Sequence, residues 1–190
     1  MTKHNPKKRR KSAYQYTPSS QMADNLATNR AGHLTKMQKA PILVAALVTG
    51  VGLTCALSFL VASVYGFLQT VDVAGIFGWI MLVFTAGSIL FLVAVLWVNA
   101  RMFIPETLSQ SPVRWERGVL EIKMASRERP EMPFSYIIGS YSFAPFVVPD
   151  EVPMHKGREY VVYYTARSRL LLSIVPTDTP DADEWLPQGE

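Results

Sequence analysis

His155 is the residue of the C-terminal half whose type most directly invites a catalytic role. Asp150 and Glu151 precede it closely, and the hydroxyls of Ser140 and Ser142 lie a little further upstream. A hydroxyl, an imidazole and a carboxylate are the parts of a hydrolase in which the histidine takes the proton of the attacking hydroxyl. No nucleophile-elbow motif surrounds either serine. We therefore predict no catalytic residue, and a hydrolase or transferase is the weakest of the functions considered.

The other reactive side chains do not form a metal or cofactor motif. A zinc site takes three or four His, Cys or carboxylate ligands, but His4 and His33 lie far upstream and Cys55 is the single cysteine. The sequence contains no glycine-rich phosphate loop and no dinucleotide fingerprint. We predict a protein that is not an enzyme and has no metal and no cofactor.

Two long apolar runs, residues 41–68 and 73–98, dominate the middle of the chain. Neither contains a charged residue, and each exceeds the roughly 20 residues that cross a hydrocarbon core of about 30 Å. A signal peptide has a shorter apolar core, of about 7–15 residues. The sequence therefore predicts a transmembrane hairpin over residues 39–103. Because neither span carries an ionisable side chain, we do not expect a transporter or a proton channel.

Charges on either side of the runs indicate how the hairpin is oriented. Lys36 and Lys39 precede the first run and Arg101 follows the second, whereas the loop 69–72 has no basic residue. Basic flanks stay on the cytoplasmic side. We expect an integral protein of the bacterial plasma membrane, with both termini in the cytoplasm.

Small residues recur at every fourth position of the first run. They are Ala46, Gly50, Thr54, Ser58, Ala62 and Gly66. Small side chains at this spacing allow helix backbones to approach closely. We interpret the stripe first as a packing surface for the second span, and alternatively as a docking face for another membrane protein.

The N-terminal segment is strongly basic. Residues 1–40 contain nine Lys or Arg and a single acid, Asp24. The densest cluster is Lys7, Lys8, Arg9, Arg10 and Lys11. Such a cluster attracts anionic lipid head groups or only keeps the N-terminus inside. We expect residues 1–38 to be a disordered tail, and we do not expect nucleic-acid binding, because Tyr14 and Tyr16 are the only aromatics there that could stack on bases.

Beyond residue 104 the apolar periodicity changes from helical to alternating. Residues 118–124 alternate apolar and polar side chains, which is typical of a half-buried strand. Further strands are predicted at 134–138, 141–143, 160–164 and 170–175, with a turn at Gly139 and Ser140. Five or so short strands predict a small all-β domain over residues 118–176, either an SH3-like or OB-like meander or an open barrel. Residues 104–117 form the linker, and residues 177–190 an acidic flexible tail.

A domain this small buries only a marginal core. We therefore expect it to lean on the membrane surface, on the linker around Trp115, or on a partner.

The last predicted hairpin carries a recognisable pattern. Gly157 is followed by Tyr160, and the stretch YVVYYTARSRLLLS continues to Ser173. It resembles the YxVYYTxxSxxLLS hairpin that ends the small C-terminal β domain of uncharacterised bacterial two-span membrane proteins. The resemblance covers about residues 40–176. It implies an architecture and no activity.

The tip of this hairpin places Arg167 and Arg169 close together. They are either charges that discourage edge pairing of the sheet or contacts for lipid head groups or an acidic partner. We predict a membrane anchor whose cytoplasmic β module binds or scaffolds a protein partner. The alternative is an accessory subunit of a larger membrane complex, held mainly through its transmembrane helices. Membrane lipids, above all anionic ones, and membrane or cytoplasmic proteins are the expected partners.

Overall fold

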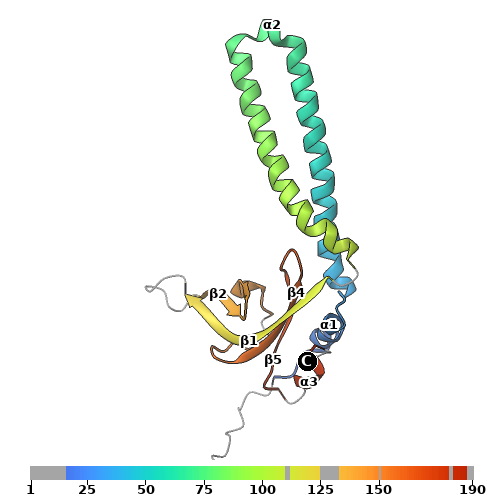
Figure 1. Ribbon diagram of the computed structural model, residues 1–190, viewed down its shortest axis with the longest axis vertical. Coiled ribbons are helices and arrows are strands. Elements are labelled where there is room, and N and C mark those ends of the chain that lie inside the picture. The colour runs from blue at the N-terminus through green and yellow to red at the C-terminus, as the bar shows by residue number, and fades with distance from the viewer. Residues whose placement is uncertain (1–15, 110–111, 125–132, 150, 180–181, 188–190) are drawn as a thin grey trace, which may run out of the picture. The chain divides into compact units, whose positions relative to one another are not determined.

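The computed structural model describes residues 16–109, 112–124, 133–149, 151–179 and 182–187 of the 190-residue chain (Figure 1). The chain divides into two compact units. We call the first, Met1–Arg30 with Trp115–Tyr163 and Ser173–Glu190, the module unit. We call the second, Ala31–Arg114 with Tyr164–Leu172, the hairpin unit.

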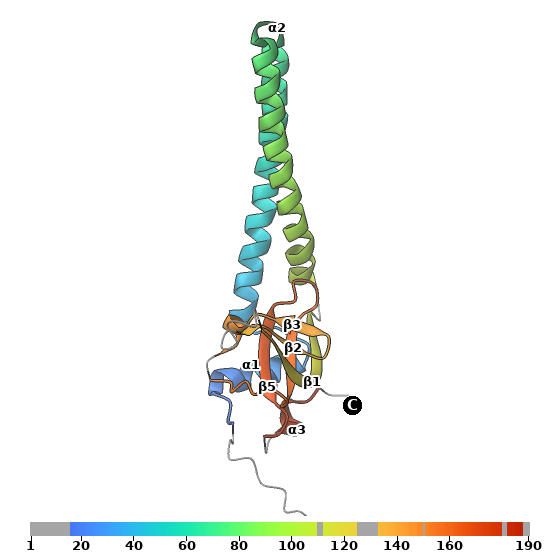
Figure 2. The ribbon, with the colours of Figure 1, turned by 90° about the vertical axis from the view of Figure 1, so that its left-hand side faces the viewer.

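The hairpin unit is built on α2 (Lys36–Leu108), which consists of two long helices. They span Lys36–Thr70 and Gly75–Leu108, and both are long and apolar enough to cross a membrane. The chain reverses at Gly75, whose φ of 55° and ψ of −163° are not helical. Glycine adopts such a conformation without steric cost. The predicted transmembrane hairpin is thus confirmed as two apolar helices lying side by side (Figures 1 and 2).

The first helix begins at a defined cap. The Thr35 hydroxyl accepts a hydrogen bond from the backbone amide of Gln38 (3.3 Å), and the Gln38 side chain accepts one from the backbone amide of Thr35 (3.1 Å). This reciprocal pair satisfies two amides that a helix start otherwise leaves without partners. The Gln38 side-chain amide also donates to the carbonyl of Leu172 (3.1 Å).

The two helices meet along a seam of buried and half-buried residues spaced by three and four. In the first helix these include Thr49, Gly52, Ala56, Leu60, Ser63 and Phe67, and in the second Gly78, Leu82, Thr85, Ile89, Val93, Leu96 and Ala100. This spacing keeps one face of each helix toward the other. Near the turn, the rings of Phe67 and Trp79 meet edge to face, with 4.9 Å between centroids.

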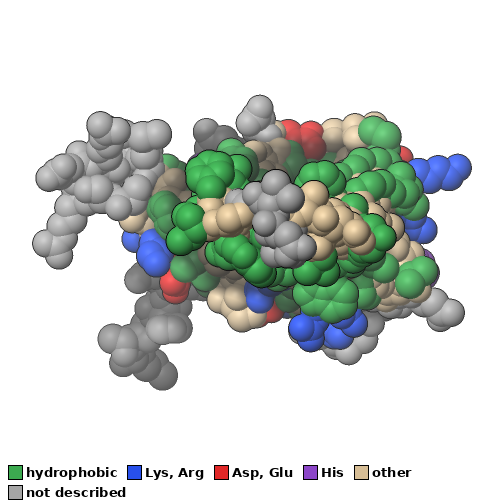
Figure 3. Space-filling model, turned by 90° about the horizontal axis from the view of Figure 1, so that it is seen from above, with side chains coloured by type: hydrophobic (Ala, Val, Ile, Leu, Met, Phe, Trp, Pro, Cys, Tyr) green, Lys and Arg blue, Asp and Glu red, His purple; other side chains and the backbone are tan. Residues whose placement is uncertain are grey.

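The remaining surface of the hairpin is apolar and exposed. Ile76, Phe84 and Phe91 are 82%, 74% and 72% exposed. Hydrophobic side chains surround the helices when the hairpin is viewed from its turn (Figure 3). An apolar surface of this extent suits lipid rather than water, which supports insertion into a membrane.

The β domain is an open five-stranded antiparallel sheet. Its strands are β1 (Val113–Met124), β2 (Pro133–Ile138), β3 (Tyr141–Phe143), β4 (Glu159–Thr165) and β5 (Leu171–Pro176). Their order is β3-β2-β1-β4-β5. The first three strands form a meander, after which the chain crosses to the other side of β1. The predicted all-β fold is confirmed, and its strand order departs from a simple meander at that crossing.

The boundaries of the strands differ from prediction mainly at β1. The predicted turn at Gly139 and Ser140 is present, because Ile138 pairs with Tyr141 across it. However, α2 extends to Leu108 and β1 begins at Val113, so the predicted linker 104–117 is wrong for most of its length. Trp115 lies within β1.

Residues from both ends of the chain complete the module unit. Helix α1 (Ser20–Arg30) buries Met22 and Leu26, and its Asn29 side chain donates to the Ser173 hydroxyl of β5 (2.8 Å). Helix α3 (Ala182–Trp185) contacts α1, and Arg30 donates to the Glu184 carbonyl (2.5 Å). The prediction of a disordered N-terminal tail is therefore wrong for α1, and the predicted flexible C-terminal tail contains α3.

Strand β4 lies at the centre of the module core. Tyr160, Val161, Val162 and Tyr163 are at most 1% exposed. A strand buried on consecutive residues is covered on both faces. Helix α1 is joined to the same sheet through the hydrogen bond from Asn29 to Ser173 of β5, and its Leu26 is fully buried. The marginal core is thus extended by α1, a source of support that the sequence analysis did not consider.

Candidate functional site

A buried carboxylate at the end of the second long helix fixes the loop between β4 and β5. Glu106 is 2% exposed. Its Oε1 accepts the backbone amides of Arg167 (2.7 Å) and Ser168 (2.9 Å), and its Oε2 accepts the Ser168 hydroxyl (2.6 Å). Charge-assisted bonds of this kind are short and strong. Glu106 therefore holds the loop that carries the two predicted contact arginines.

The loop itself is strongly constrained. The hydroxyls of Thr165 and Ser168 lie 2.7 Å apart, and the Leu170 amide donates to the Thr165 hydroxyl (2.8 Å). Arg169 has a φ of 54°, and its guanidinium lies 5.6 Å from the centroid of the Tyr164 ring. The predicted pair is brought together on one short loop, and the side chains of Arg167 and Arg169 are exposed. A loop held in this way could present the two arginine side chains to an anionic group.

A cavity of about 120 Å³ lies beside Glu106 in the hairpin unit. Its lining residues are His33, Leu34, Lys39, Ile42, Leu43, Glu106, Thr107, Ser109 and Pro112. Leu34, Ile42, Glu106 and Pro112 are buried, whereas the other lining residues are exposed. The buried lining residues thus include Glu106, and the exposed ones include Lys39 and His33.

The small-residue stripe of the first helix does not form the seam of the hairpin. Thr54, Ser58, Ala62 and Gly66 are exposed. Among the described residues, no heavy atom lies within 4 Å of where a Cβ at Gly50 or Gly66 would be. The preferred interpretation, packing against the second span, is wrong for this part of the stripe. Residues spaced by four turn gradually around the helix, so they leave the seam, whose residues are spaced by three and four.

Gly52, which the sequence analysis did not single out, lies in the seam instead. A Cβ at this position would lie 3.4 Å from Leu96 Cδ2.

Two shallow grooves follow the stripe. One, of about 390 Å³, is lined by Ala46, Leu47, Gly50, Val51, Thr54 and Cys55. The other, of about 500 Å³, is lined by Leu57, Ser58, Val61, Ala62 and Tyr65. Both lie on the first long helix, where the small side chains leave space between larger neighbours. A helix from another protein could approach closely there.

The basic cluster of residues 7–11 lies outside the described residues. Its expected contact with anionic lipid therefore stays a prediction.

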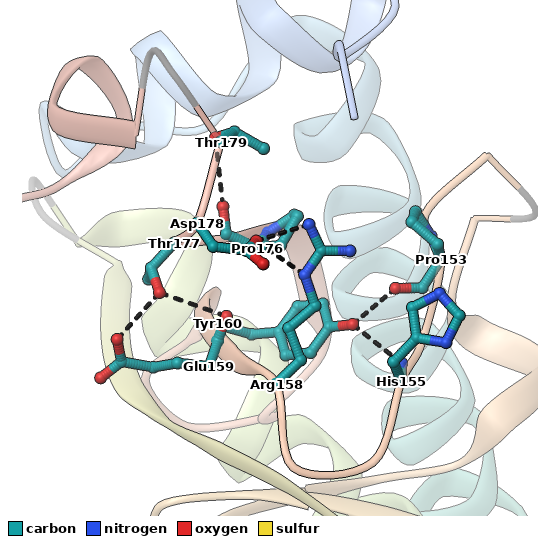
Figure 4. Close-up of polar contacts among 9 residues, drawn as sticks. All are labelled: Pro153, His155, Arg158, Glu159, Tyr160, Pro176, Thr177, Asp178 and Thr179. Carbon is teal, nitrogen blue, oxygen red and sulfur yellow. Dashed lines mark hydrogen bonds and ion pairs between the residues drawn. The ribbon is translucent and has the colours of Figure 1, made fainter. Parts of the chain in front are cut away.

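The backbone of the loop that carries His155 makes two polar contacts with the Tyr160 hydroxyl (Figure 4). The His155 backbone amide donates to the Tyr160 hydroxyl (2.9 Å), which donates to the Pro153 carbonyl (2.5 Å). Burial raises the pKa of Tyr160, so this hydroxyl stays protonated. The Ser140 hydroxyl, one of the two candidate nucleophiles, donates to Glu116 Oε2 (3.2 Å).

Strands β4 and β1 are joined by an exposed ion pair next to this loop. Arg117 Nε lies 3.0 Å from Glu159 Oε1, and the Thr177 hydroxyl donates to Glu159 Oε2 (2.8 Å). The hydrogen bonds from Arg117 and Thr177 lower the pKa of Glu159. Arg158 similarly pairs with Asp178 through its Nε (2.7 Å). These contacts tie strand ends together, and Figure 4 shows those of Glu159 with Thr177 and of Arg158 with Asp178.

Within the part of the chain that the structure describes, no group of three or more His, Cys, Asp or Glu side chains could hold a metal ion. A scan against protein-family models, a search of the curated proteins and a search of the solved structures each find no match to the chain. The resemblance noted from the hairpin sequence stays a prediction.

Proposed function

We propose that the protein is a non-enzymatic accessory subunit of a membrane complex, which binds a partner's transmembrane helix through the small-residue stripe of its first helix. The main support for this proposal is that the stripe faces away from the second helix, with Thr54, Ser58 and Ala62 exposed. The flanking charges support an orientation with both termini in the cytoplasm.

The relief of the first helix supports this function. Its exposed small residues lie between exposed large ones, such as Leu57, Val61 and Tyr65. Between them lie grooves of about 390 and 500 Å³. In a membrane, helices associate through close packing rather than the hydrophobic effect, so small residues favour contact with another helix.

Site-specific photo-crosslinking tests the proposed face. A photoreactive residue replaces Ser58 on the stripe or, as the matched control, Val83 on the outward face of the second helix, and both positions are exposed. In native membranes we expect Ser58 to give one discrete adduct with a membrane protein, and Val83 to give none. Equal crosslinking from both positions, or none from either, would contradict the proposal.

Bulky substitutions on the stripe and in the seam distinguish a loss of partner binding from a loss of folding. Gly50→Leu and Ala62→Leu fill the stripe and should abolish the Ser58 adduct while the hairpin stays intact, because a Cβ at Gly50 meets no described atom within 4 Å. Gly52→Leu places the same side chain against Leu96 in the seam, and should lower the amount of protein in the membrane. An adduct that survives Gly50→Leu and Ala62→Leu would place the partner elsewhere.

The exposed apolar residues of the module unit favour the second candidate function, in which the β module itself binds a protein. Phe146, in η1 (Pro145–Val147), is 88% exposed, and Phe134 in the adjacent β2 is 64% exposed. Large exposed aromatics near the centre of a patch are typical anchors of protein interfaces.

Two sets of variants distinguish this second candidate from the first. If the β module binds the partner, two double variants should release it. One combines Phe134→Ser with Phe146→Ser, and the other combines Arg167→Glu with Arg169→Glu. If the stripe binds the partner, these variants should retain it and Gly50→Leu should release it.

A further inference from the structure

The cavity of the hairpin unit is lined by a buried acid and by exposed basic residues. None of these residues belongs to the proposed docking face on the first helix. The buried lining residues of the cavity include Glu106 and Ile42, each 2% exposed. The basic lining residues are Lys39 and His33, both exposed. The volume of about 120 Å³ would hold roughly four waters of about 30 Å³ each, which is enough for a small polar group.

Glu106 retains the capacity to bind a cation. Its three hydrogen-bond donors are two backbone amides and one hydroxyl, all of them neutral. A carboxylate offers about four acceptor sites, so the donors among the described residues leave about one, on Oε2. A carboxylate that is removed from water is stabilised most by a positively charged donor. An ammonium group in the cavity would supply both the charge and the hydrogen bond.

The position of the cavity along the helix matches the layer of lipid head groups. Glu106 lies five residues beyond Arg101, the first charge after the apolar run, which is about 7.5 Å along a helix. The head-group layer extends roughly 5–8 Å beyond the hydrocarbon on each side. On the first helix, Lys39 lies just before the uncharged run 41–68. Head groups of the surrounding bilayer therefore lie at the depth of the cavity.

We propose that this cavity binds the head group of a zwitterionic aminophospholipid, phosphatidylethanolamine. Its ammonium group donates to Glu106, and its phosphate lies beside Lys39 and His33. The exposed Leu43 lies beside the start of the acyl chains. A purely anionic head group would bring a second negative charge to the carboxylate. Phosphatidylcholine carries a fully methylated nitrogen and cannot donate a hydrogen bond. The inference rests on membrane insertion of the hairpin and not on the proposed partner.

Native mass spectrometry of the full-length protein tests this proposal. The protein is reconstituted into nanodiscs with equal amounts of phosphatidylethanolamine, phosphatidylcholine and phosphatidylglycerol, and the lipids that remain bound after release are counted. We expect phosphatidylethanolamine to be retained about tenfold over phosphatidylcholine, as one charge-assisted hydrogen bond would give. Stepwise methylation of the amine should reduce the retention in steps.

Variants identify the groups responsible. Glu106→Gln keeps a side chain of the same shape but removes the charge, and should abolish the preference for phosphatidylethanolamine. Ser168→Ala removes one of the loop's own bonds to Glu106 and should leave the preference intact.

Lys39→Glu should reduce retention of both phosphatidylethanolamine and phosphatidylcholine, because both carry the phosphate. Lys36→Glu, on the same helix and outside the cavity lining, should change neither.

Three results would overturn the proposal. They are equal retention of phosphatidylethanolamine and phosphatidylcholine by the wild type, highest retention of phosphatidylglycerol, and a preference that survives Glu106→Gln. Soluble glycerophosphoethanolamine is added as a competitor to identify the source of the head group. If it binds as tightly as the lipid, the ligand is a soluble phosphoethanolamine and the assignment to a lipid is wrong.

Discussion

At the scale of residues, Glu106 is the side chain on which the β4–β5 loop depends. Its carboxylate accepts three hydrogen bonds from Arg167 and Ser168, while its side chain is almost completely buried. The sequence offered only an isolated acid after Pro105 in a segment predicted to be a linker. A buried acid of this kind could be recognised only once the loop that surrounds it was known.

Replacing Glu106 by alanine should release this loop. Two part-buried backbone amides lose their acceptor, while the Ser168 hydroxyl keeps its contact with the Thr165 hydroxyl. A fully buried donor left unsatisfied costs about 1–3 kcal/mol. We expect hydrogen exchange at the amides of Arg167 and Ser168 to accelerate by at least about tenfold, which corresponds to about 1.4 kcal/mol. Ser168→Ala is the control, since it removes only the hydroxyl and should have a much smaller effect. Unchanged exchange in Glu106→Ala would show that the carboxylate does not hold the loop.

Tyr163 gives the module unit a dependence on alkaline pH. Its hydroxyl donates to the Trp185 carbonyl (2.6 Å), and burial raises its pKa from 10.0 to about 12. Because the folded state binds this proton more tightly than the unfolded state, its contribution is complete below pH 10 and is lost as the pH rises toward 12. The two-unit difference corresponds to about 2–3 kcal/mol.

Ultraviolet titration of tyrosinate absorption checks this prediction. Tyr163→Phe should remove one late-titrating tyrosine and flatten the loss of stability above pH 10. A wild-type protein in which Tyr163 titrates at its ordinary pKa would contradict the assigned burial.

At the scale of elements, the sequence predicted those whose pattern is local. The two long helices could be predicted because residues 41–68 and 73–98 lack any charge. The second half of β1 and the whole of β4 could be predicted from alternation or from a β-branched and aromatic run. The first half of β1 could not, because Arg114, Trp115 and Arg117 show no alternation.

Helix α1 was missed because it has little apolar periodicity and buries only Met22, Leu26 and Asn29. Its stability comes from tertiary packing against the sheet, and single-sequence patterns do not report that. The seam of the hairpin was not predicted either, because its residues range in size from Gly52 to Phe67 and form no visible pattern in a run that is apolar throughout.

Substitution within α1 should therefore destabilise the module unit. Leu26 is fully buried, and Leu26→Ala in a well-packed core costs about 2–5 kcal/mol. We expect limited proteolysis to cleave near α1 much faster in this variant. Gln21→Ala, on the exposed side of the same helix, should behave as wild type. If Leu26→Ala were as resistant as Gln21→Ala, α1 would not be an integral part of the module.

At the scale of the whole molecule, the module unit contains residues from before the first long helix and after the second. A chain that crosses a membrane twice returns to the side from which it started. This connectivity agrees with the basic flanks of the two runs, which predict that both ends lie in the cytoplasm.

Cysteine labelling in intact cells that express the protein checks the orientation of the hairpin. In a Cys55→Ser background, single cysteines replace Gln69 near the hairpin turn, Asp24 in α1 or Lys156 in the module, all of which are exposed. We expect a membrane-impermeant maleimide to label the Gln69→Cys protein in intact cells and the other two only after permeabilisation. The reverse pattern would place the module outside the cell.

In the proposed function, the small-residue stripe of the first helix holds this protein in a larger membrane complex. The most direct test is the particle mass of the C-terminally tagged protein after extraction from native membranes in mild detergent, compared between wild type and the Gly50→Leu, Ala62→Leu double variant. We predict a large wild-type particle with fixed companions, and a double variant that is still folded but reduced to one or two copies of the chain. A wild-type particle of one or two copies without companions, or a large particle unaffected by the double substitution, would contradict the claim.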